Sequence, residues 1–386
     1  MRKEKILFIS EIQDPYTKGS STQIMTENII AGLKEISNIH FIAIVDWDSN
    51  KSNVRKYFED KVDRLTIIDS QLQLRKISNK YLRQLELLKF SLKNFNNSNL
   101  KEIHIEEYEK ILTHSPSIES IKVAEFLKKN SKKKIKNYQY WSDPLALSGI
   151  YPNEVGIKRF LLFTIEKLMH KKADYIIFGT KTLYQNQKKI FNNKNFRYSD
   201  VSYSANEEKK RCTSSQDQKI RFGYSGQYNS QLRNIEVLYN VFFNNKFNEL
   251  ELTIVGESDL KLNPKENIQI IKKRYSQNDI KKIEEEFDVI VTLLNKNCIQ
   301  IPGKLFYNIN SEKPIIVILD GLIKESIKSY LESFNRFIFV ENTEEDIYKL
   351  LSNFNKEHLK IENETAKLLL SPSFVSNQIL QGGLTD

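Results

Sequence analysis

The sequence is poor in cysteine, glycine and proline, and it contains no long hydrophobic run. Its two cysteines, Cys212 and Cys298, exclude a disulfide framework and a cysteine-rich zinc site, and they fit a reduced cytosolic interior. Twelve glycines and eight prolines in 386 residues exclude collagen-like repeats and long flexible linkers. No stretch approaches the roughly 18 uncharged apolar residues of a membrane-spanning helix. The apolar run Ile6–Ile9 is stopped by Glu11 and Asp14, so we expect no secretory signal.

Apolar residues are nevertheless plentiful, at 40% of the chain with 22 Phe and 18 Tyr, which is enough for two cores. The net charge is +10, and its placement is uneven. Between Lys122 and Arg197 there are 17 Lys and Arg against 5 Asp and Glu, a net charge of +12. This window indicates either a solvated surface or an anionic partner, such as a membrane surface or an acidic substrate. We expect no nucleic-acid partner, because no zinc-finger spacing, RNP-type motif or clear helix-turn-helix is present.

Along the first half, short apolar runs alternate with segments whose apolar residues have helical spacing, as in a parallel α/β sheet. Polar residues follow several of these strands. Gly19 and Ser20 lie in the turn after the first strand, where the start of a helix suits an anion. His114 opens a polar turn after another strand, and Asp143 follows a third strand, so both are expected at the carboxyl edge of the sheet. The predicted strands are Lys5–Ser10, Ile39–Val45, Leu65–Ile68, Ile111–Thr113, Asn137–Ser142 and Ala173–Thr180.

The segment Glu207–Lys219 contains no apolar residue except Cys212, and it marks a domain boundary. We therefore expect a first domain over 1–206, a linker over 207–219, and a second domain over 220–365. Residues 366–386 are predicted to pack back on the first domain. The second half repeats the alternation, with strands predicted at Ile220–Ser225, Leu250–Val255, Ile268–Ile271, Val289–Leu294, Ile315–Leu319 and Arg336–Val340.

The stretch Ile299–Leu319 carries the strongest chemical signal of the second half. Lys304 is expected to open a helix of about three turns that ends at Lys313-Pro314. Free N–H groups and a lysine at such a helix start suit a phosphate. The fold class is therefore α/β, with two Rossmann-like doubly wound domains facing across a cleft. The edges of that cleft are expected to hold Gly19, His114, Asp143, Gly226 and Lys304.

The basic, apolar helix predicted over Lys158–Lys172 either packs on its own sheet or lies on a membrane surface. Together with the basic window, it leads us to expect a cytoplasmic protein held peripherally at the inner face of the cell membrane.

The chain resembles the glycosyltransferases of the two-Rossmann-domain (GT-B) fold, and in particular glycosyltransferase family 4, which includes many capsule and lipopolysaccharide enzymes. The resemblance covers nearly the whole chain. It is carried by the Gly19 turn, His114-Ser-Pro116, Trp141-Ser-Asp143-Pro144, the pair Ile165-Glu166 with Ala173–Ile177, and Gly226-x6-Arg233.

Two departures stand against the resemblance. Gln227 occupies a position where the family often has Arg, and the family's paired glutamates would fall on Ile299 and Tyr307. Lys304-Leu305-Phe306 does match the start of the helix found in capsule-type members. In the family, the second glutamate usually accepts a hydrogen bond from a ribose hydroxyl of the donor. Either neighbouring groups replace this glutamate here, or the protein is a poor or inactive enzyme.

The resemblance implies transfer of a sugar from a UDP- or GDP-sugar to a glycan or lipid-linked saccharide, with retention of configuration. It also implies that residues 1–206 form the acceptor-binding domain and residues 220–365 the nucleotide-sugar-binding domain. Arg233, Lys304, Gly19, Ser20 and Gly226 would bind the donor diphosphate, because its departure creates negative charge that cations and helix starts stabilise. His114 and Asp143 would act at the sugar, and Tyr275 and Tyr307 would lie near the donor nucleoside and ribose. No metal and no cofactor is expected. A sugar-nucleotide epimerase, which would need several carboxylates where Asp143 is nearly alone, and a non-catalytic partner subunit remain alternatives.

Overall fold

The structure is a computed structural model in which the chain divides into two units, Met1–Ala205 with Leu370–Asp386, and Asn206–Leu369. These units are the first and the second domain. The residues that the structure describes are 3–16, 21–46, 48–115, 117–146, 156–204, 219–273, 275, 277–296, 299–359, 361 and 363–385.

The first domain is built on a parallel sheet with the strand order β3-β2-β1-β4-β5-β6-β7. Its central strands are buried on both faces, as their continuous apolar runs require; Ile6 to Ile9 are fully buried in β1. The order reverses between β1 and β4, which makes this point of the carboxyl edge the topological switch point. The strands are β1 (Glu4–Ile12), β2 (Ser37–Val45), β3 (Arg64–Asp69), β4 (Lys110–Ser115), β5 (Lys136–Trp141), β6 (Tyr175–Phe178) and β7 (Phe196–Tyr198).

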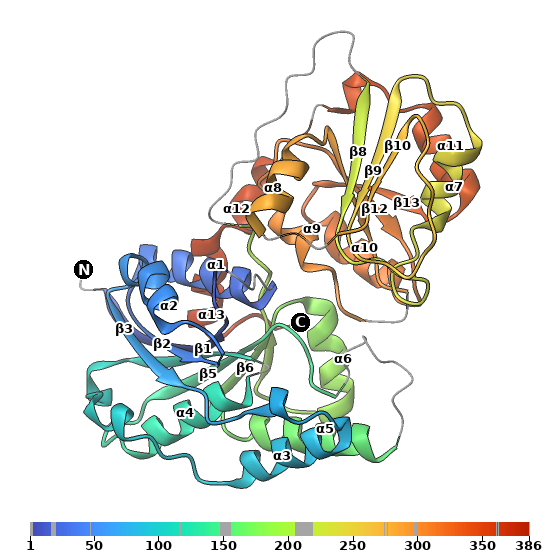
Figure 1. Ribbon diagram of the computed structural model, residues 1–386. Helices are drawn as coiled ribbons and strands as arrows, with labels where there is room; N and C mark the ends of the chain where they lie inside the picture. Colours follow the sequence, from blue (N-terminus) through green and yellow to red (C-terminus); the bar gives the residue numbers. More distant parts are fainter. Residues whose placement is uncertain are drawn as a thin grey trace. The chain divides into compact units, whose positions relative to one another are not determined.

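Helices cover both faces of this sheet, with α1, α2 and α13 on one side and α3, α4 and α5 on the other (Figure 1). The C-terminal helix packs against α1 so closely that a Cβ on Gly32 would lie 2.0 Å from the carbonyl oxygen of Pro372. Glycine is thus required at this helix crossing. The helices are α1 (Ser21–Ile36), α2 (Lys51–Phe58), α3 (Lys80–Leu92), α4 (Ile118–Lys129), α5 (Ile157–His170), α6 (Lys181–Phe191) and α13 (Pro372–Leu380).

The second domain has a six-stranded parallel sheet in the order β10-β9-β8-β11-β12-β13. Helices α7 and α11 lie on one side and α8 and α9 on the other (Figure 1). Its strands are β8 (Ile220–Ser225), β9 (Leu250–Val255), β10 (Ile268–Ile271), β11 (Val289–Leu293), β12 (Ile315–Leu319) and β13 (Phe337–Glu341). Its helices are α7 (Glu236–Asn244), α8 (Gln277–Glu285), α9 (Gly303–Tyr307), α10 (Lys324–Glu332), α11 (Glu344–Ser352) and α12 (Glu364–Leu369).

The fold class is confirmed: both domains are doubly wound parallel α/β sheets. All twelve predicted strands are present, with ends that differ by a few residues, and the sequence pattern missed β7, α2, α10, α12 and α13. Thr343 caps α11, accepting from the backbone N–H of Asp346. Among the described residues, no helix is long and apolar enough to cross a membrane.

The helix that Lys304 was expected to open is much shorter than predicted. It ends at Tyr307, and turns lead from there to β12. The buried guanidinium of Arg336 donates to the carbonyl oxygens of Ile309, Ser311 and Lys313 at 3.1, 2.8 and 2.8 Å. Because a side chain satisfies these carbonyls, the segment needs no helical hydrogen bonds.

Candidate functional site

Two strands of the second sheet are each followed by a glycine at the carboxyl edge. Gly226 follows β8 with φ +146° and Gly256 follows β9 with φ +147°. A Cβ on Gly256 would lie 1.9 Å from the carbonyl oxygen of Gly226, so any side chain would clash with the backbone there. Only glycine allows both the backbone conformation and this close approach. At these two positions the edge therefore presents backbone rather than side chains. The N–H groups of Gly226 and Gly256 donate to the carbonyl oxygens of Val255 and Ile271 at 2.9 and 3.0 Å.

Arg233 lies at this edge and is held in place by neighbours. Its Nε donates to Oδ1 of Asn295 at 2.5 Å, and its backbone pairs with Asn229. Asn295 is buried and donates from Nδ2 to the carbonyl oxygen of Gln300 at 2.8 Å. The Tyr224 hydroxyl also interacts with Arg233, and burial raises the pKa of this tyrosine. The guanidinium is therefore fixed at the end of β11.

Lys304 lies at the same edge but carries an ion pair. Its Nζ donates to Ser225 Oγ at 2.7 Å and to Glu284 Oε1 at 2.7 Å. Ser225 also hydrogen-bonds Glu284. The Lys304 side chain is 39% exposed, whereas that of Glu284 is only 7% exposed. The buried carboxylate of Glu284 thus offsets part of the positive charge of Lys304, the residue that we expected to bind phosphate.

The two tyrosines expected near the donor nucleoside differ in their surroundings. Tyr307 is buried, and its hydroxyl lies 3.1 Å from the position of a Cβ on Gly303. Tyr275 is half-buried, with the Lys273 ammonium 5.2 Å from its ring centroid. Tyr307 therefore packs within its own helix turn, and Tyr275 has the more accessible ring.

In the first domain, His114 lies on β4 and not in a polar turn as the sequence suggested. It is 1% exposed, and Nδ1 shares a 2.9 Å hydrogen bond with Thr26 Oγ1, which in turn contacts Ser10 Oγ at 3.0 Å. Burial lowers the pKa of His114 to about 4. Its Nε2 is buried and has no hydrogen-bond partner among the described residues. The imidazole is therefore neutral at physiological pH, and Thr26 holds only one of its two nitrogens.

Asp143 lies in the loop after β5 and is half-buried. Ser142 Oγ donates to Asp143 Oδ2 at 3.4 Å, and the next turn is held by Glu166, whose Oε2 accepts from the backbone N–H of Ala146 at 2.8 Å. Burial raises the pKa of Glu166 to about 7. Glu166 is thus a structural support for the loop that carries Asp143. Two of the predicted site residues, Gly19 and Ser20, lie outside the described residues.

A cavity of about 360 Å³ opens at the carboxyl ends of β1, β2 and β3. Two carboxylates, Glu11 and Asp46, and the guanidinium of Arg83 line it. The sequence pattern did not bring these three residues together, and Asp143 is not the only carboxylate at this edge of the first sheet. The lining residues are Glu11, Ile12, Gln13, Thr22, Ile44, Asp46, Ser70, Leu72, Leu74 and Arg83.

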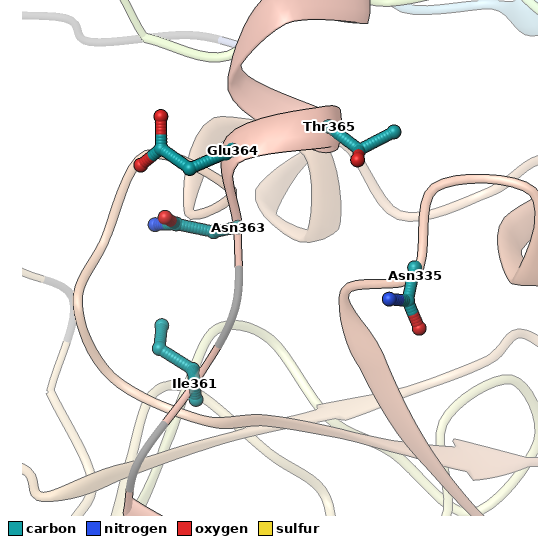
Figure 2. Close-up of a pocket in the computed structure, with 5 residues that line it drawn as sticks. All are labelled: Asn335, Ile361, Asn363, Glu364 and Thr365. Carbon is teal, nitrogen blue, oxygen red and sulfur yellow. The ribbon is translucent and has the colours of Figure 1, made fainter.

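A smaller cavity of about 240 Å³ in the second domain is lined by Asn335, Ile361, Asn363, Glu364 and Thr365 (Figure 2). Asn335 shortly precedes β13, and Asn363 donates to the carbonyl oxygen of Ser311, which precedes β12. This cavity therefore lies at the amino ends of the strands, away from Arg233 and Lys304.

Of the residues that the sequence singled out, Gly226, Arg233 and Lys304 share one edge of the second domain. His114 and Asp143 lie at the ends of neighbouring strands, β4 and β5, of the first. The residues that sequence reasoning missed are the partners of these groups. Asn295 could have been found, because it directly follows a predicted strand. Glu284 could not, since it lies within a charged helical segment, Lys281–Glu286, with nothing to distinguish it.

No protein-family model matches the sequence, and no curated protein matches it either. Solved structures do match over nearly the whole chain. The sucrose-phosphate synthase of Thermosynechococcus elongatus is 13% identical with a TM-score of 0.62, and the alignment covers 98% of each chain. The lipopolysaccharide outer core galactosyltransferase WaaB is 12% identical with a TM-score of 0.50, covering 98% of this chain and 99% of that one.

A third similar structure is the UDP-GlcNAc 2-epimerase of Neisseria meningitidis bound to UDP-GlcNAc. It is 11% identical with a TM-score of 0.51, and the alignment covers 98% of this chain and 99% of the epimerase. At these identities the likeness shows the fold alone. The chain has the two-Rossmann-domain GT-B fold, which glycosyltransferases and sugar-nucleotide epimerases share.

Proposed function

We propose that the protein is a glycosyltransferase that takes a sugar from a nucleoside-diphosphate donor, UDP- or GDP-linked. The observation that carries the proposal is the position of Arg233 at the carboxyl edge of the second sheet. Asn295 fixes its guanidinium there, and Gly226 and Gly256 leave this edge without side chains at two strand ends. A fixed guanidinium suits a diphosphate, whose charge grows as the sugar leaves. Lys304 adds a second cation, reduced in strength by Glu284.

In the first domain, His114 is suited to bind a sugar hydroxyl rather than to carry charge. With a pKa of about 4 it is neutral at physiological pH, and Thr26 holds its Nδ1. Its Nε2 can donate to or accept from a hydroxyl according to the tautomer. The leaving diphosphate would then take the proton of the acceptor hydroxyl. Asp143, which lies after the end of the neighbouring strand β5, would be a second polar group near His114. No step in this scheme calls for a metal or a cofactor.

The resemblance to glycosyltransferase family 4 supports the finer part of the proposal: retention of configuration, and a glycan or lipid-linked saccharide of a cell-surface polysaccharide as acceptor. The anomeric coupling of the product, measured by NMR, tests the stereochemistry. A product of inverted configuration would remove the family assignment and make Asp143 the candidate general base.

A membrane location at the cytoplasmic face would bring a lipid-linked acceptor within reach, and helix α5 supports it. Ile157 and Phe160, one turn apart, are 64% and 70% exposed. Lys167 is exposed on the same side, and the one carboxylate of α5, Glu166, is fully buried. Exposed aromatic and aliphatic groups with an unopposed basic face fit an anionic lipid surface.

Co-sedimentation with vesicles tests this location. Ile157→Ser/Phe160→Ser should reduce binding to vesicles that contain phosphatidylglycerol, whereas Leu322→Ser, which removes a 96% exposed leucine of the second domain, should not. Equal and negligible binding of the unchanged protein to anionic and neutral vesicles would refute the membrane location.

An epimerase acting on a sugar nucleotide is the second candidate, and one observation favours it. Glu11 and Asp46 line the first-domain cavity, so carboxylates able to move protons are present at this edge. A non-catalytic partner subunit is the third candidate, and the fixed Arg233 weighs against it.

Incubation with a panel of UDP- and GDP-sugars, followed by NMR, separates these candidates. A transferase releases the nucleoside diphosphate, slowly to water without acceptor and faster with a suitable one. An epimerase instead converts the donor into a second sugar nucleotide and incorporates solvent deuterium at the inverted carbon. We expect release of nucleoside diphosphate from at least one donor. Epimer formation would refute the transferase proposal, and no reaction combined with no binding of any donor would leave only the non-catalytic role.

A further inference from the structure

Glu284, Ser225 and Lys304 form a cluster that links three separate parts of the second domain: helix α8, the end of β8, and the start of α9. The Lys304 ammonium is bonded to both other members at 2.7 Å. Ser225 and Glu284 are also bonded to each other, which closes the triangle. Nothing in the sequence suggested grouping these residues, because 20 positions separate Glu284 from Lys304 and 79 separate Ser225 from it.

Within the cluster, Glu284 is the fixed member. The last turn of α8 is pinned by Lys313, which is fully buried and whose Nζ donates to the carbonyl oxygens of Glu284 and Glu285, each at 2.8 Å. The segment that carries Lys313 is held in turn by the guanidinium of Arg336. Glu284 therefore lies on a rigid support, with its side chain 7% exposed.

Lys304 is the member that is able to reorient. Its ammonium is on a flexible four-carbon stem, and its side chain is 39% exposed at the carboxyl edge of the sheet. Without a fixed acceptor, an exposed lysine samples many rotamers, and few of them would place Nζ next to Ser225 at the end of β8. The carboxylate of Glu284 selects those rotamers, at the cost of offsetting part of the charge.

We propose that Glu284 is the positioning residue for Lys304: it holds the ammonium at the end of β8 so that Lys304 can bind the donor diphosphate beside Arg233. The inference rests on the proposed function, because it assigns Glu284 a role in nucleoside-diphosphate binding. It differs from a purely structural ion pair, which would join α9 to α8 and leave ligand affinity unaffected. It also differs from charge competition, in which Glu284 would weaken binding.

A double-mutant cycle separates these roles. Calorimetry would measure UDP and GDP binding to the unchanged protein and to Glu284→Ala, Lys304→Ala and the double variant, with thermal unfolding of each. Glu285→Ala is the matched control, an exposed carboxylate on the same helix turn. We expect Lys304→Ala to weaken binding about tenfold or more and Glu284→Ala about three- to tenfold, since both remove a held charge–phosphate contact.

The decisive result is the double variant. If Glu284 acts only through Lys304, then Glu284→Ala has no further effect on binding in the Lys304→Ala background, because the position it sets no longer matters. Glu284→Gln should recover part of the affinity, since its amide oxygen can still accept from Lys304. The control should bind normally.

Three results would overturn the inference. Tighter binding by Glu284→Ala or Glu284→Gln would show charge competition. Unchanged affinity with a lower unfolding temperature would show a structural pair. Losses that add in the double variant would show that Glu284 acts independently of Lys304. In all three cases binding to the unchanged protein and its loss in Arg233→Ala would keep the proposed function, whereas an unchanged protein that binds neither UDP nor GDP would overturn both.

Discussion

Asn295→Asp is the substitution that most directly tests whether Arg233 serves as the diphosphate ligand. The two side chains have nearly the same shape, so the new carboxylate would still accept from Arg233 Nε, which now lies 2.5 Å from Oδ1 of Asn295. The change adds one negative charge beside the guanidinium. It also removes the 2.8 Å hydrogen bond from Nδ2 to the carbonyl oxygen of Gln300.

The magnitude follows from the position of the new charge. A phosphate on the far side of the guanidinium would lie roughly 6 Å from the carboxylate, and Coulomb repulsion there is about 1.5–3 kcal/mol at an effective dielectric constant of about 20–40. Since about 1.4 kcal/mol corresponds to a tenfold change, nucleoside-diphosphate affinity should fall about 10- to 100-fold. Loss of the Gln300 bond should lower the free energy of unfolding by about 1–2 kcal/mol.

Calorimetry with UDP and GDP at fixed ionic strength measures the affinity, and thermal unfolding confirms that the variant is folded. Asn295→Ala is the matched control: it loses both hydrogen bonds without adding charge, and should weaken binding less than Asn295→Asp does. The reasoning is refuted if Asn295→Asp is folded and binds the nucleoside diphosphate as tightly as the unchanged protein. Arg233 would then be a structural residue at this edge.

Three further substitutions probe other parts of the fold. His114→Ala should lower kcat by roughly a hundredfold with a smaller change in donor affinity, as for a contact made chiefly in the transition state. Because His114 is buried against Thr26, we also expect a lower unfolding temperature. Unaltered turnover in steady-state assays would exclude a role for His114 in the reaction. Glu166→Gln should stabilise the protein at pH 8 and have little effect at pH 5. The folded-state pKa of about 7 lies above the ordinary value of 4.5, so the stability that the protonated carboxyl contributes is present below pH 4.5 and is lost as pH rises toward 7; equal unfolding-temperature shifts at both pH values would contradict this. Gly256→Ala should destabilise the second domain strongly, since its Cβ would lie 1.9 Å from the Gly226 carbonyl oxygen. An unfolding temperature equal to that of the unchanged protein would show that the backbone at Gly226 can move aside.

Local composition was enough to predict the alternation of strands and helices, and hence the fold. Runs such as Ile6–Ile9 and Ile315–Leu319 are apolar at every position, which only a strand buried on both faces tolerates. Gly226, Arg233, His114 and Asp143 could be placed at the sheet edges because parallel strands end at one edge whatever their order. The pattern was weakest for short or exposed elements: β7 has three residues, and α2 has two buried ones, too few to establish a period.

Which groups meet depends instead on contacts between residues far apart in the chain, and these leave no local trace. The sequence could not show that Glu284 holds Lys304 or that Asn295 holds Arg233. Nor could it show that Glu11, Asp46 and Arg83 share one cavity. His114 is the clearest case: its polar neighbours in sequence suggested an exposed turn, but β1 and β5 flank β4 on both sides, and burial sets both its pKa and its hydrogen bonds. Strand order and side-chain packing determine the electrostatics of this site, and neither is written in the spacing of residues along the chain.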